Sequence, residues 1–375
     1  MISPFRQDRI QTAHVMVVGC GALGNEVLKN LVLQGISHLL IVDFDRVEPD
    51  NLTRSVLFTT DDARSCRYKV EAVTDSLRRM SPGIDVQSVI GDIAYDVGLG
   101  VIRQMDVVIG CVDNRWARYC INRLCMRAGK SWVDGGIDGL EGTVRVFVPG
   151  ENCYACNLGP EGLRDMSYRM SCAGTIRRNL ETGKSPTTAI AASVVGAVQV
   201  QEAMKLLHRE ELAQGLMTSL CGRMFYYEGQ HLSTKTVAFK AFDEDCPEHE
   251  MWLPVRTSPL DNQHSVGHFL AWLEEELGTH HVHFSLYDDC FVDYVVRKDN
   301  DQRTTVMKPG HLVAEAVASH PVLGGIPFSG LYQNEYREIG FDFPYQDIAL
   351  CDLGIPRQQV LPVATEAETY YIALG

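Results

Sequence analysis

The feature that most limits what this chain can fold into is a glycine-rich loop between a predicted strand and a predicted helix. Residues 14–18 (HVMVV) are a short apolar run, and Gly19, Gly21 and Gly24 follow it in G-x-G-x-x-G spacing. Residues 39–43 (LLIVD) then predict a second buried strand. Glycines in this context let backbone amides approach a phosphate at the N-terminus of the helix. The pattern therefore predicts a β-α-β unit with a nucleotide site.

The segments that follow alternate in the same manner, which predicts an α/β fold. Helices are predicted at 68–80 and 115–128, and strands at 84–90, 106–111, 131–134 and 143–148. Such alternation is typical of an open, mostly parallel, Rossmann-like sheet with helices on both faces. After an irregular segment, Ser185 and Pro186 predict the N-cap and first residue of a further helix that ends near Leu207.

The charge is unevenly distributed along the 375 residues. The formal net charge is −14, and residues 241–375 alone hold 22 acidic against 7 basic side chains. This asymmetry predicts a boundary near 240–255 and a smaller acidic domain over 255–375. Its helix and strand patterns lack β-α-β order, which predicts an α+β fold. The acidic balance argues against a nucleic-acid binder. Neither a membrane span nor a signal peptide is evident, so a cytoplasmic protein is expected.

Four motifs follow the glycine loop in a characteristic order. They are Asp43-Phe44-Asp45, Asn51-Leu52-Thr53-Arg54, Lys69 and Cys111-Val112-Asp113-Asn114. Their order resembles that of the ubiquitin-activating-enzyme family, including its ThiF and MoeB-like bacterial members, over about residues 14–250. The resemblance implies an ATP-dependent adenylyltransferase with an adenylation domain over 1–250 and a crossover loop at about 157–186.

The resemblance also implies a role for each motif. The glycine loop and Asp45 belong to the nucleotide-binding set, Asp43 holds the ribose, Asn51, Arg54 and Lys69 surround the triphosphate, and Asp113 binds Mg²⁺. In this family a C-terminal carboxylate attacks the α-phosphate of ATP. Because two anions must meet, cations are needed, and an aspartate is a suitable hard ligand for magnesium. No general base is expected, since the carboxylate is already ionised.

The chain also departs from the family pattern. Ser55 stands where glutamine is usual, and the spacing from Arg54 to Lys69 is two residues longer than in MoeB-like relatives. The family often begins with an R-x-x-R-Q segment whose arginine reaches the ATP of a partner subunit. Only 13 residues precede the first predicted strand here, and Arg6 and Arg9 are weak substitutes. Another subunit is therefore one expected source of that arginine.

Two pairs of metal-ligand residues occur far apart in the sequence. Cys153 and Cys156 form a C-x-x-C pair, and Cys246 and His249 form a C-x-x-H pair. Together they predict a closed tetrahedral zinc site, although relatives often use C-x-x-C twice. The alternative is that the four residues are unrelated. Three further histidines at 280, 281 and 283 lack a second ligand cluster, so no metal site is expected there.

Cys172 lies in the irregular segment ahead of Ser185. In family members that pass the acyl group onward, a crossover-loop cysteine forms a thioester, and the resemblance assigns this role to Cys172. Neighbouring Arg169, Arg177 and Arg178 would favour the thiolate. Two alternatives stay open: an incidental thiol, and a sulfur-carrier enzyme whose cysteine forms no obligatory thioester.

These predictions combine into one function. The chain is expected to use ATP, Mg²⁺ and structural Zn²⁺ to activate the C-terminal glycine of a small ubiquitin-like or sulfur-carrier protein, as a homodimer or heterodimer. The acidic C-terminal domain loosely resembles a ubiquitin-fold domain and is expected to recruit a conjugating enzyme; a solvated surface without a partner is the alternative.

Three other classes of function remain as alternatives. They are an adenylating enzyme for a peptide or small-molecule carboxylate, an NAD-dependent oxidoreductase, and a scaffold subunit. The oxidoreductase would leave Lys69, Asp113 and both metal-ligand pairs unexplained.

Overall fold

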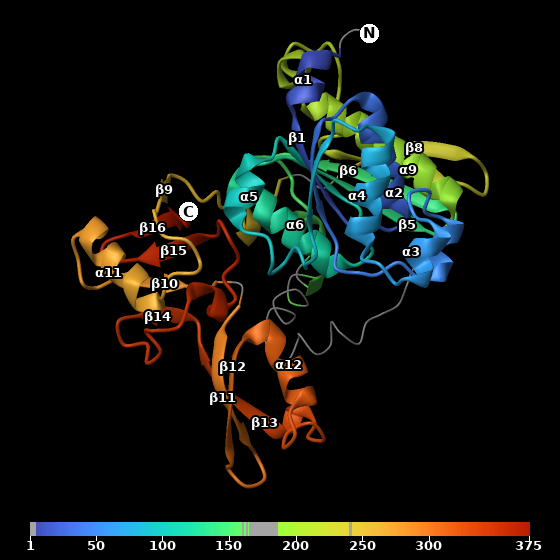
Figure 1. The fold of residues 1–375 in the computed structure, drawn as a ribbon. Helices are drawn as coiled ribbons and strands as arrows, with labels where there is room; N and C mark the ends of the chain where they lie inside the picture. The colour runs from blue at the N-terminus through green and yellow to red at the C-terminus, as the bar shows by residue number, and fades with distance from the viewer. Residues whose placement is uncertain (1–4, 160, 163, 165–186, 240–241, 288) are drawn as a thin grey trace. The chain divides into compact units, whose positions relative to one another are not determined.

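The computed structural model describes residues 5–159, 161–162, 164, 187–239, 242–287 and 289–375. The chain divides into two compact units, which are coloured by residue number in Figure 1. Met1–Asp96, Val101–Gly159 and Lys184–Met251 belong to the first unit, and the short segment Val97–Gly100 and Trp252–Gly375 belong to the second. The adenylation domain over 1–250 and the acidic domain over 255–375 stay predictions, both in their boundaries and in their functions.

The first unit is built on an eight-stranded sheet of order β3-β2-β1-β4-β5-β6-β7-β8. Its strands are β1 (His14–Val18), β2 (His38–Val42), β3 (Asp85–Val89), β4 (Val107–Gly110), β5 (Trp132–Asp138), β6 (Glu141–Phe147), β7 (Arg223–Glu228) and β8 (Ser233–Ala238). The five strands from β3 to β5 pair in parallel, whereas β6, β7 and β8 add antiparallel strands at one edge. The predicted mostly parallel α/β sheet is confirmed.

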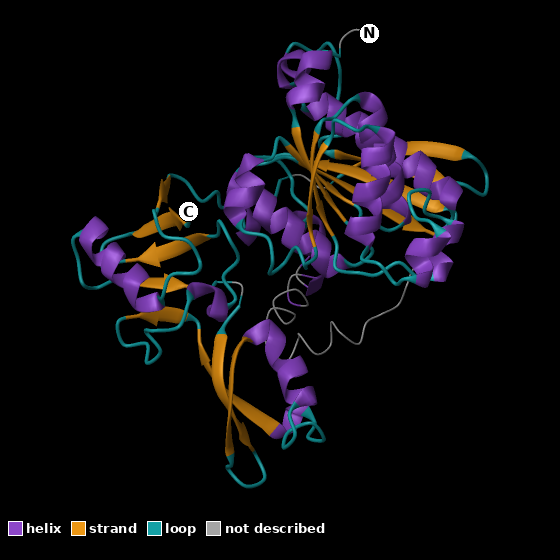
Figure 2. Cartoon of the chain, viewed as in Figure 1, coloured by secondary structure: helices purple, strands orange, loops and turns teal. Residues whose placement is uncertain are grey.

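Helices cover both faces of this sheet (Figures 1 and 2). They are α1 (Gln7–Thr12), α2 (Ala22–Gln34), α3 (Thr60–Arg64), α4 (Lys69–Met80), α5 (Leu99–Gln104), α6 (Arg115–Ala128), α9 (Ala189–Leu206) and α10 (Arg209–Ala213). Apolar side chains of α2, α4 and α9 form one core with alternate residues of the parallel strands. Burial on both faces explains why β1 and β4 are almost continuous apolar runs.

One predicted helix start is wrong. Helix α9 begins at Ala189, and its N-cap is Thr188, whose hydroxyl accepts a hydrogen bond from the Ala191 N–H at 3.2 Å. Ser185 and Pro186, which we expected in these positions, lie outside the described residues. The sequence offers two capping signals three residues apart, and local chemistry alone does not choose between them.

From Trp252 to Gly375, the described residues form two small sheets and two α-helices, which confirms the predicted α+β class. The five-stranded sheet has the order β14-β10-β15-β16-β9 and the three-stranded sheet has the order β12-β11-β13. The strands are β9 (Val255–Thr257), β10 (His283–Ser285), β11 (Phe291–Arg297), β12 (Arg303–Pro309), β13 (Leu331–Tyr336), β14 (Glu338–Gly340), β15 (Val360–Ala364) and β16 (Thr369–Ala373). Helices α11 (Val266–Leu277) and α12 (Gly310–Ser319) each contribute to a separate apolar core.

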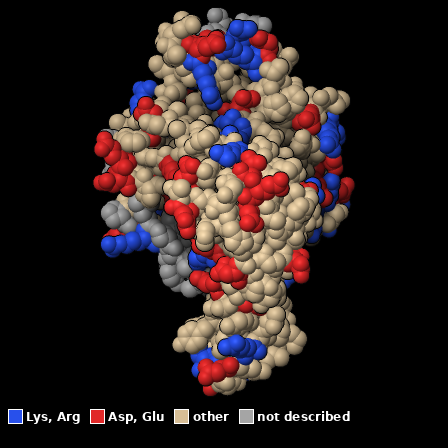
Figure 3. Space-filling model, turned by 90° about the vertical axis from the view of Figure 1, so that its left-hand side faces the viewer, with Lys and Arg blue, Asp and Glu red and all other residues tan. Residues whose placement is uncertain are grey.

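Figure 3 shows one face of the molecule, on which Asp and Glu side chains form several separate groups. None of the helices among the described residues is long and apolar enough to cross a lipid bilayer.

Candidate functional site

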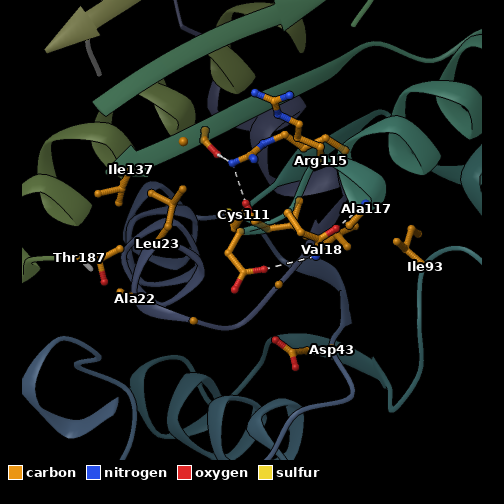
Figure 4. Close-up of a pocket in the computed structure, with 18 of the residues that line it drawn as sticks. Val18, Ala22, Leu23, Asp43, Ile93, Cys111, Arg115, Ala117, Ile137 and Thr187 are labelled. Atoms are coloured by element: carbon orange, nitrogen blue, oxygen red, sulfur yellow. Dashed lines mark hydrogen bonds between the residues drawn. The ribbon is translucent and has the colours of Figure 1, made fainter. Parts of the chain in front are cut away.

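A cavity of about 570 Å³ lies at the carboxyl edge of the parallel strands in the first unit. Its walls come from the ends of β1, β2, β4 and β5 and from the start of α2, as the labelled residues in Figure 4 illustrate. The carboxyl edge is where open α/β sheets bind ligands, because the strand-to-helix loops converge there. Seven of the predicted nucleotide-site residues line this cavity: Gly19, Gly21, Asp43, Asp45, Arg54, Lys69 and Asp113.

The glycine loop is shaped by close backbone approaches. Gly19 has φ +97°, and a Cβ there would lie 2.5 Å from the carbonyl oxygen of Cys111. A Cβ on Gly24 would lie 1.9 Å from the Gly19 carbonyl oxygen, so Gly24 packs the helix against the loop although it does not line the cavity. Gly21 is the N-cap of α2, and a Cβ there would meet no atom within 4 Å. The loop thus leaves space beside a helix N-terminus, which favours anions.

Asp43 fastens the glycine loop to the end of β2. Its Oδ2 accepts a hydrogen bond from the Cys20 N–H at 2.6 Å, and its Oδ1 accepts one from the Asp45 N–H at 2.7 Å. Burial raises the pKa of Asp43, although the neighbouring Lys69 ammonium lowers it. The carboxyl group therefore lies at the cavity wall where a ribose is expected, and it also orders the loop.

Two predicted cations reach the cavity with carboxylates beside them. Lys69 Nζ, at the start of α4, lies 2.7 Å from Asp45 Oδ2. Burial lowers the pKa of Lys69, but Asp43 and Asp45 outweigh it, so the pKa is raised overall and the side chain stays charged. Arg54 Nη2 lies 3.0 Å from Asp50 Oδ2. Both cations are thus oriented within the first unit before any anion binds.

Asn51 and Ser55 lie behind Arg54 rather than in the cavity. Asn51 is buried, and its Oδ1 accepts a hydrogen bond from the Glu48 N–H at 3.0 Å within a 3-10 turn, Pro49–Thr53. Asn51 does not line the cavity, so its expected contact with the triphosphate stays a prediction. Ser55 is also buried, and its Oγ has no hydrogen-bond partner among the described residues.

Asp113 follows β4 and faces the cavity next to a helix cap. Asn114 Oδ1 accepts a hydrogen bond from the Ala117 N–H at 2.8 Å, which starts α6. Asn114 Nδ2 lies 3.3 Å from Asp113 Oδ1. A carboxylate held at the strand end in this way offers the oxygen donor that magnesium prefers.

Sequence reasoning missed two arginines of the cavity wall and the buried aspartate that pairs with them. Asp134 is fully buried and accepts hydrogen bonds from Arg118 Nε at 2.9 Å and Arg145 Nε at 3.0 Å. Both arginines line the cavity. Burial lowers the pKa of Arg118 but Asp134 raises it, and the overall direction is upward. No motif in the sequence links these three residues, since they come from three separate elements, β5, α6 and β6.

A buried glutamine, also missed, fixes two of the strand ends. Gln199 of α9 donates from Nε2 to the Gly110 carbonyl oxygen at 2.9 Å, and a Cβ on Gly135 would lie 2.4 Å from its side chain. Gly135 therefore allows this close approach. The side chain of Gln199 thus connects the end of β4 to β5, where its Nε2 also lies 3.5 Å from the Val133 carbonyl oxygen.

The arginines near the N-terminus are engaged elsewhere in the first unit. Arg9 forms ion pairs with Glu210 and Glu211, and Arg6 pairs with Asp8. Neither arginine lines the cavity. These ion pairs hold both side chains away from the chain's own cavity, and the source of the family arginine stays a prediction.

The four predicted zinc ligands converge in the first unit. The ligand atoms of Cys153, Cys156, Cys246 and His249 all lie within 4.8 Å of one another. The Sγ atom of Cys153 lies 3.8 Å from that of Cys246 and 3.6 Å from that of Cys156. Two sulfurs bound to one tetrahedral zinc at about 2.3 Å would lie about 3.8 Å apart. The donor set and its spacing therefore fit a structural zinc ion.

A buried polar contact holds the second pair of ligands in place. Glu248, between Cys246 and His249, accepts a hydrogen bond from the Tyr119 hydroxyl of α6 at 2.6 Å. Its other oxygen lies 3.4 Å from Arg123 Nε. These contacts anchor the 3-10 turn Pro247–His249 to the body of the first unit.

The predicted nucleophile lies outside the described residues. This holds for Cys172 and equally for Arg169, Arg177 and Arg178. The thioester role of Cys172 therefore stays a prediction.

Comparison with known proteins places this chain in a family. The model of the ThiF family matches residues 1–248. This chain belongs to the ThiF family. The sequence is 32% identical over 246 residues to the SAMP-activating enzyme E1 of Haloferax volcanii, covering 66% of this chain and 83% of that protein. It is 30% identical over 252 residues to the sulfur carrier protein adenylyltransferase of Thermus thermophilus, covering 66% of this chain and 85% of that protein.

A solved structure supports the fold of the first unit. Escherichia coli MccB, solved with selenomethionine MccA, aligns with a TM-score of 0.51 at 22% identity and covers 65% of this chain and 68% of its own. This likeness shows the fold alone. The relatives, in contrast, confirm the predicted enzyme class, an ATP-dependent adenylyltransferase, and set aside the oxidoreductase and scaffold alternatives.

Proposed function

We propose that this ThiF-family enzyme adenylates the C-terminal glycine carboxylate of a small ubiquitin-like or sulfur-carrier protein and then transfers the acyl group to Cys172. The observation that carries the proposal is the convergence of the glycine loop, Lys69, Arg54 and Asp113 on one cavity. The names of the Haloferax and Thermus relatives supply the class of substrate.

In the first step, a carboxylate oxygen of the carrier attacks the α-phosphorus of ATP. A new oxygen–phosphorus bond forms, the bond to the β-phosphate breaks, and pyrophosphate leaves. Lys69 and Arg54 offset the repulsion between the two anions, and the amides at the start of α2 bind phosphate oxygens. Asp43 orients the ribose. No side chain has to remove a proton in this step.

Two metal ions complete the proposed enzyme. Asp113 would hold Mg²⁺, which supplies positive charge at the phosphates. Cys153, Cys156, Cys246 and His249 would hold Zn²⁺, and a closed four-ligand site of this kind has a structural role. Zinc would then tie the end of the first unit to the segment after β6.

In the second step, the Cys172 thiolate attacks the carbonyl carbon of the acyl adenylate. A carbon–sulfur bond forms and AMP leaves with the electrons of the broken carbon–oxygen bond, so the product is a thioester. The alternative is a sulfur-carrier adenylyltransferase without an obligatory thioester, which the name of the Thermus relative favours.

The remaining parts of the proposal concern partners and location. A second subunit, either a further copy or a different chain, would supply the arginine that the family often places in its N-terminal segment. The acidic second unit would recruit a conjugating enzyme with a basic surface. The enzyme would act in the cytoplasm.

The test of adenylation is exchange of labelled pyrophosphate into ATP in the presence of a glycine-ended carrier protein. Exchange should require the carrier's terminal glycine, so the same carrier without that residue is the control. Exchange that ignores the terminal glycine, or ATP that fails to bind, would contradict the proposal.

A further inference from the structure

A buried amide side chain connects the glycine loop to the segment that carries Arg54. Asn25, in the first turn of α2, is fully buried. Its Nδ2 donates to the carbonyl oxygens of Cys20 at 2.8 Å and Gly21 at 3.0 Å. Its Oδ1 accepts a hydrogen bond from the Leu57 N–H at 2.8 Å. A single side chain therefore bonds to two peptides of the loop and to one peptide three residues after Arg54.

The same peptide segment is held from its other side. The buried Ser76 Oγ, on α4, donates to the carbonyl oxygen of Leu57 at 2.6 Å. Helix α4 begins at Lys69, the second cation of the cavity. The Asn25–Leu57–Ser76 network thus joins the three elements that bring the glycine loop, Arg54 and Lys69 to the cavity.

The geometry of the loop peptides makes Asn25 relevant to phosphate binding. In a planar trans peptide, the N–H points opposite to the C=O. Because the carbonyls of Cys20 and Gly21 point at Asn25, the N–H groups of Gly21 and Ala22 point away from it. Gly21 and Ala22 line the cavity, so these amides are the ones available to a phosphate.

We propose that Asn25 is a positioning residue for the triphosphate. Its side chain fixes the glycine-loop amides and the Arg54 segment in place relative to each other. The inference rests on the proposed binding of ATP in the cavity. Asn25 acts only through the backbone that it bonds, since it is buried and does not line the cavity. Its loss should therefore weaken binding of phosphates more than binding of the nucleoside.

The experiment measures the affinity of the full-length chain for ATP and for adenosine. Asn25→Ala removes all three hydrogen bonds. Asn25→Asp keeps the shape and the acceptor for Leu57, but an ionised carboxylate cannot donate to the loop carbonyls. The matched control is Asn122→Ala, which removes a fully buried amide whose Oδ1 accepts from Trp132 Nε1 at 3.3 Å and the Tyr154 N–H at 2.9 Å.

Both Asn25 variants should bind ATP roughly tenfold or more weakly than the wild type, because buried hydrogen bonds to the loop are lost. Their affinity for adenosine should change less than about twofold, and Asn122→Ala should keep its ATP affinity even where its thermal stability falls. Unchanged ATP affinity in Asn25→Ala would overturn the inference. Equal losses for ATP and adenosine would also overturn it, since they would indicate a general distortion.

Hydrogen exchange of the ligand-free chain separates this inference from the proposed function. Asn25→Ala should speed hydrogen exchange of the amides in residues 19–24 and in residues 54–58. Asn25→Asp should speed exchange in 19–24 more than in 54–58, because it keeps the acceptor for Leu57. Unchanged exchange in either segment of Asn25→Ala would contradict the coupling. Failure of the wild type to bind ATP would contradict the proposed function, whatever the exchange experiment gives.

Discussion

The cavity and the Cys/His cluster of the first unit are built in opposite ways. The cavity brings partly exposed charges together, and each predicted cation already has a carboxylate partner, as Lys69 has Asp45. The cluster instead brings together three buried thiols and one imidazole, whose ligand atoms all lie within 4.8 Å of one another. The difference indicates that the cavity can exist before its ligand binds, whereas the cluster would gain stability from the proposed zinc ion. Changes in the cavity should therefore impair chemistry, and changes in the cluster should impair folding.

The largest effect is expected in the cavity. Asp113→Ala should lower carrier-dependent ATP–pyrophosphate exchange by roughly 10²–10³-fold, because the proposed magnesium ligand at the reacting phosphates is lost. Arg54→Ala should act in the same direction. The control is Asp61→Ala, which removes an exposed carboxylate of α3 that pairs with Arg64. Exchange at the wild-type rate in Asp113→Ala would contradict the assignment of this carboxylate.

Transfer should be separable from adenylation by one thiol. Cys172→Ala should still catalyse exchange, since no thiol takes part in the first step, but it should form no reductant-sensitive adduct with the carrier. Gel electrophoresis without reductant measures the adduct, and Cys221→Ala is a control outside the proposed site. An unchanged adduct in Cys172→Ala would move the nucleophile to another cysteine.

The cluster should respond in stability rather than in rate. Elemental analysis should find about one zinc per chain, and Cys156→Ser should lower the melting temperature by roughly 6–12 °C, which corresponds to about 3 kcal/mol in a domain of this size. Exchange per folded molecule should change much less. Cys125→Ser, at another buried thiol, should leave the zinc content intact. A zinc-free wild type of normal stability would show that the four residues do not form a metal site.

The smallest effect is expected from the acidic surface of the second unit. Replacing the exposed Glu275 and Glu276 of α11 by lysine should slow delivery to a basic conjugating enzyme severalfold at low salt, with adenylation unchanged. The difference from wild type should shrink as salt is raised, because exposed charges are screened. A loss that is independent of salt would point to a contact other than charge.

Cavity residues were predictable where a motif fixed their position relative to a strand end. Lys69 and Asp113 each follow a strand or begin a helix, and their order after the glycine loop indicated the family. Arg118, Asp134 and Arg145 carry no such signal, since their contacts arise only when α6, β5 and β6 pack together. Asn25 looks like an ordinary polar residue in a helix until Leu57 is placed beside it.

The sequence by itself determined the α/β class, the glycine loop and the two pairs of metal-ligand residues, because strand and helix periodicity and C-x-x-C spacing are local properties. The tertiary structure decided which of those residues meet. It brought the Sγ atoms of Cys153 and Cys246, which are 93 residues apart in the sequence, to a distance of 3.8 Å. It also placed Asn51 in a turn rather than at the cavity. Such contacts depend on long-range packing, and no local preference of the chain specifies them.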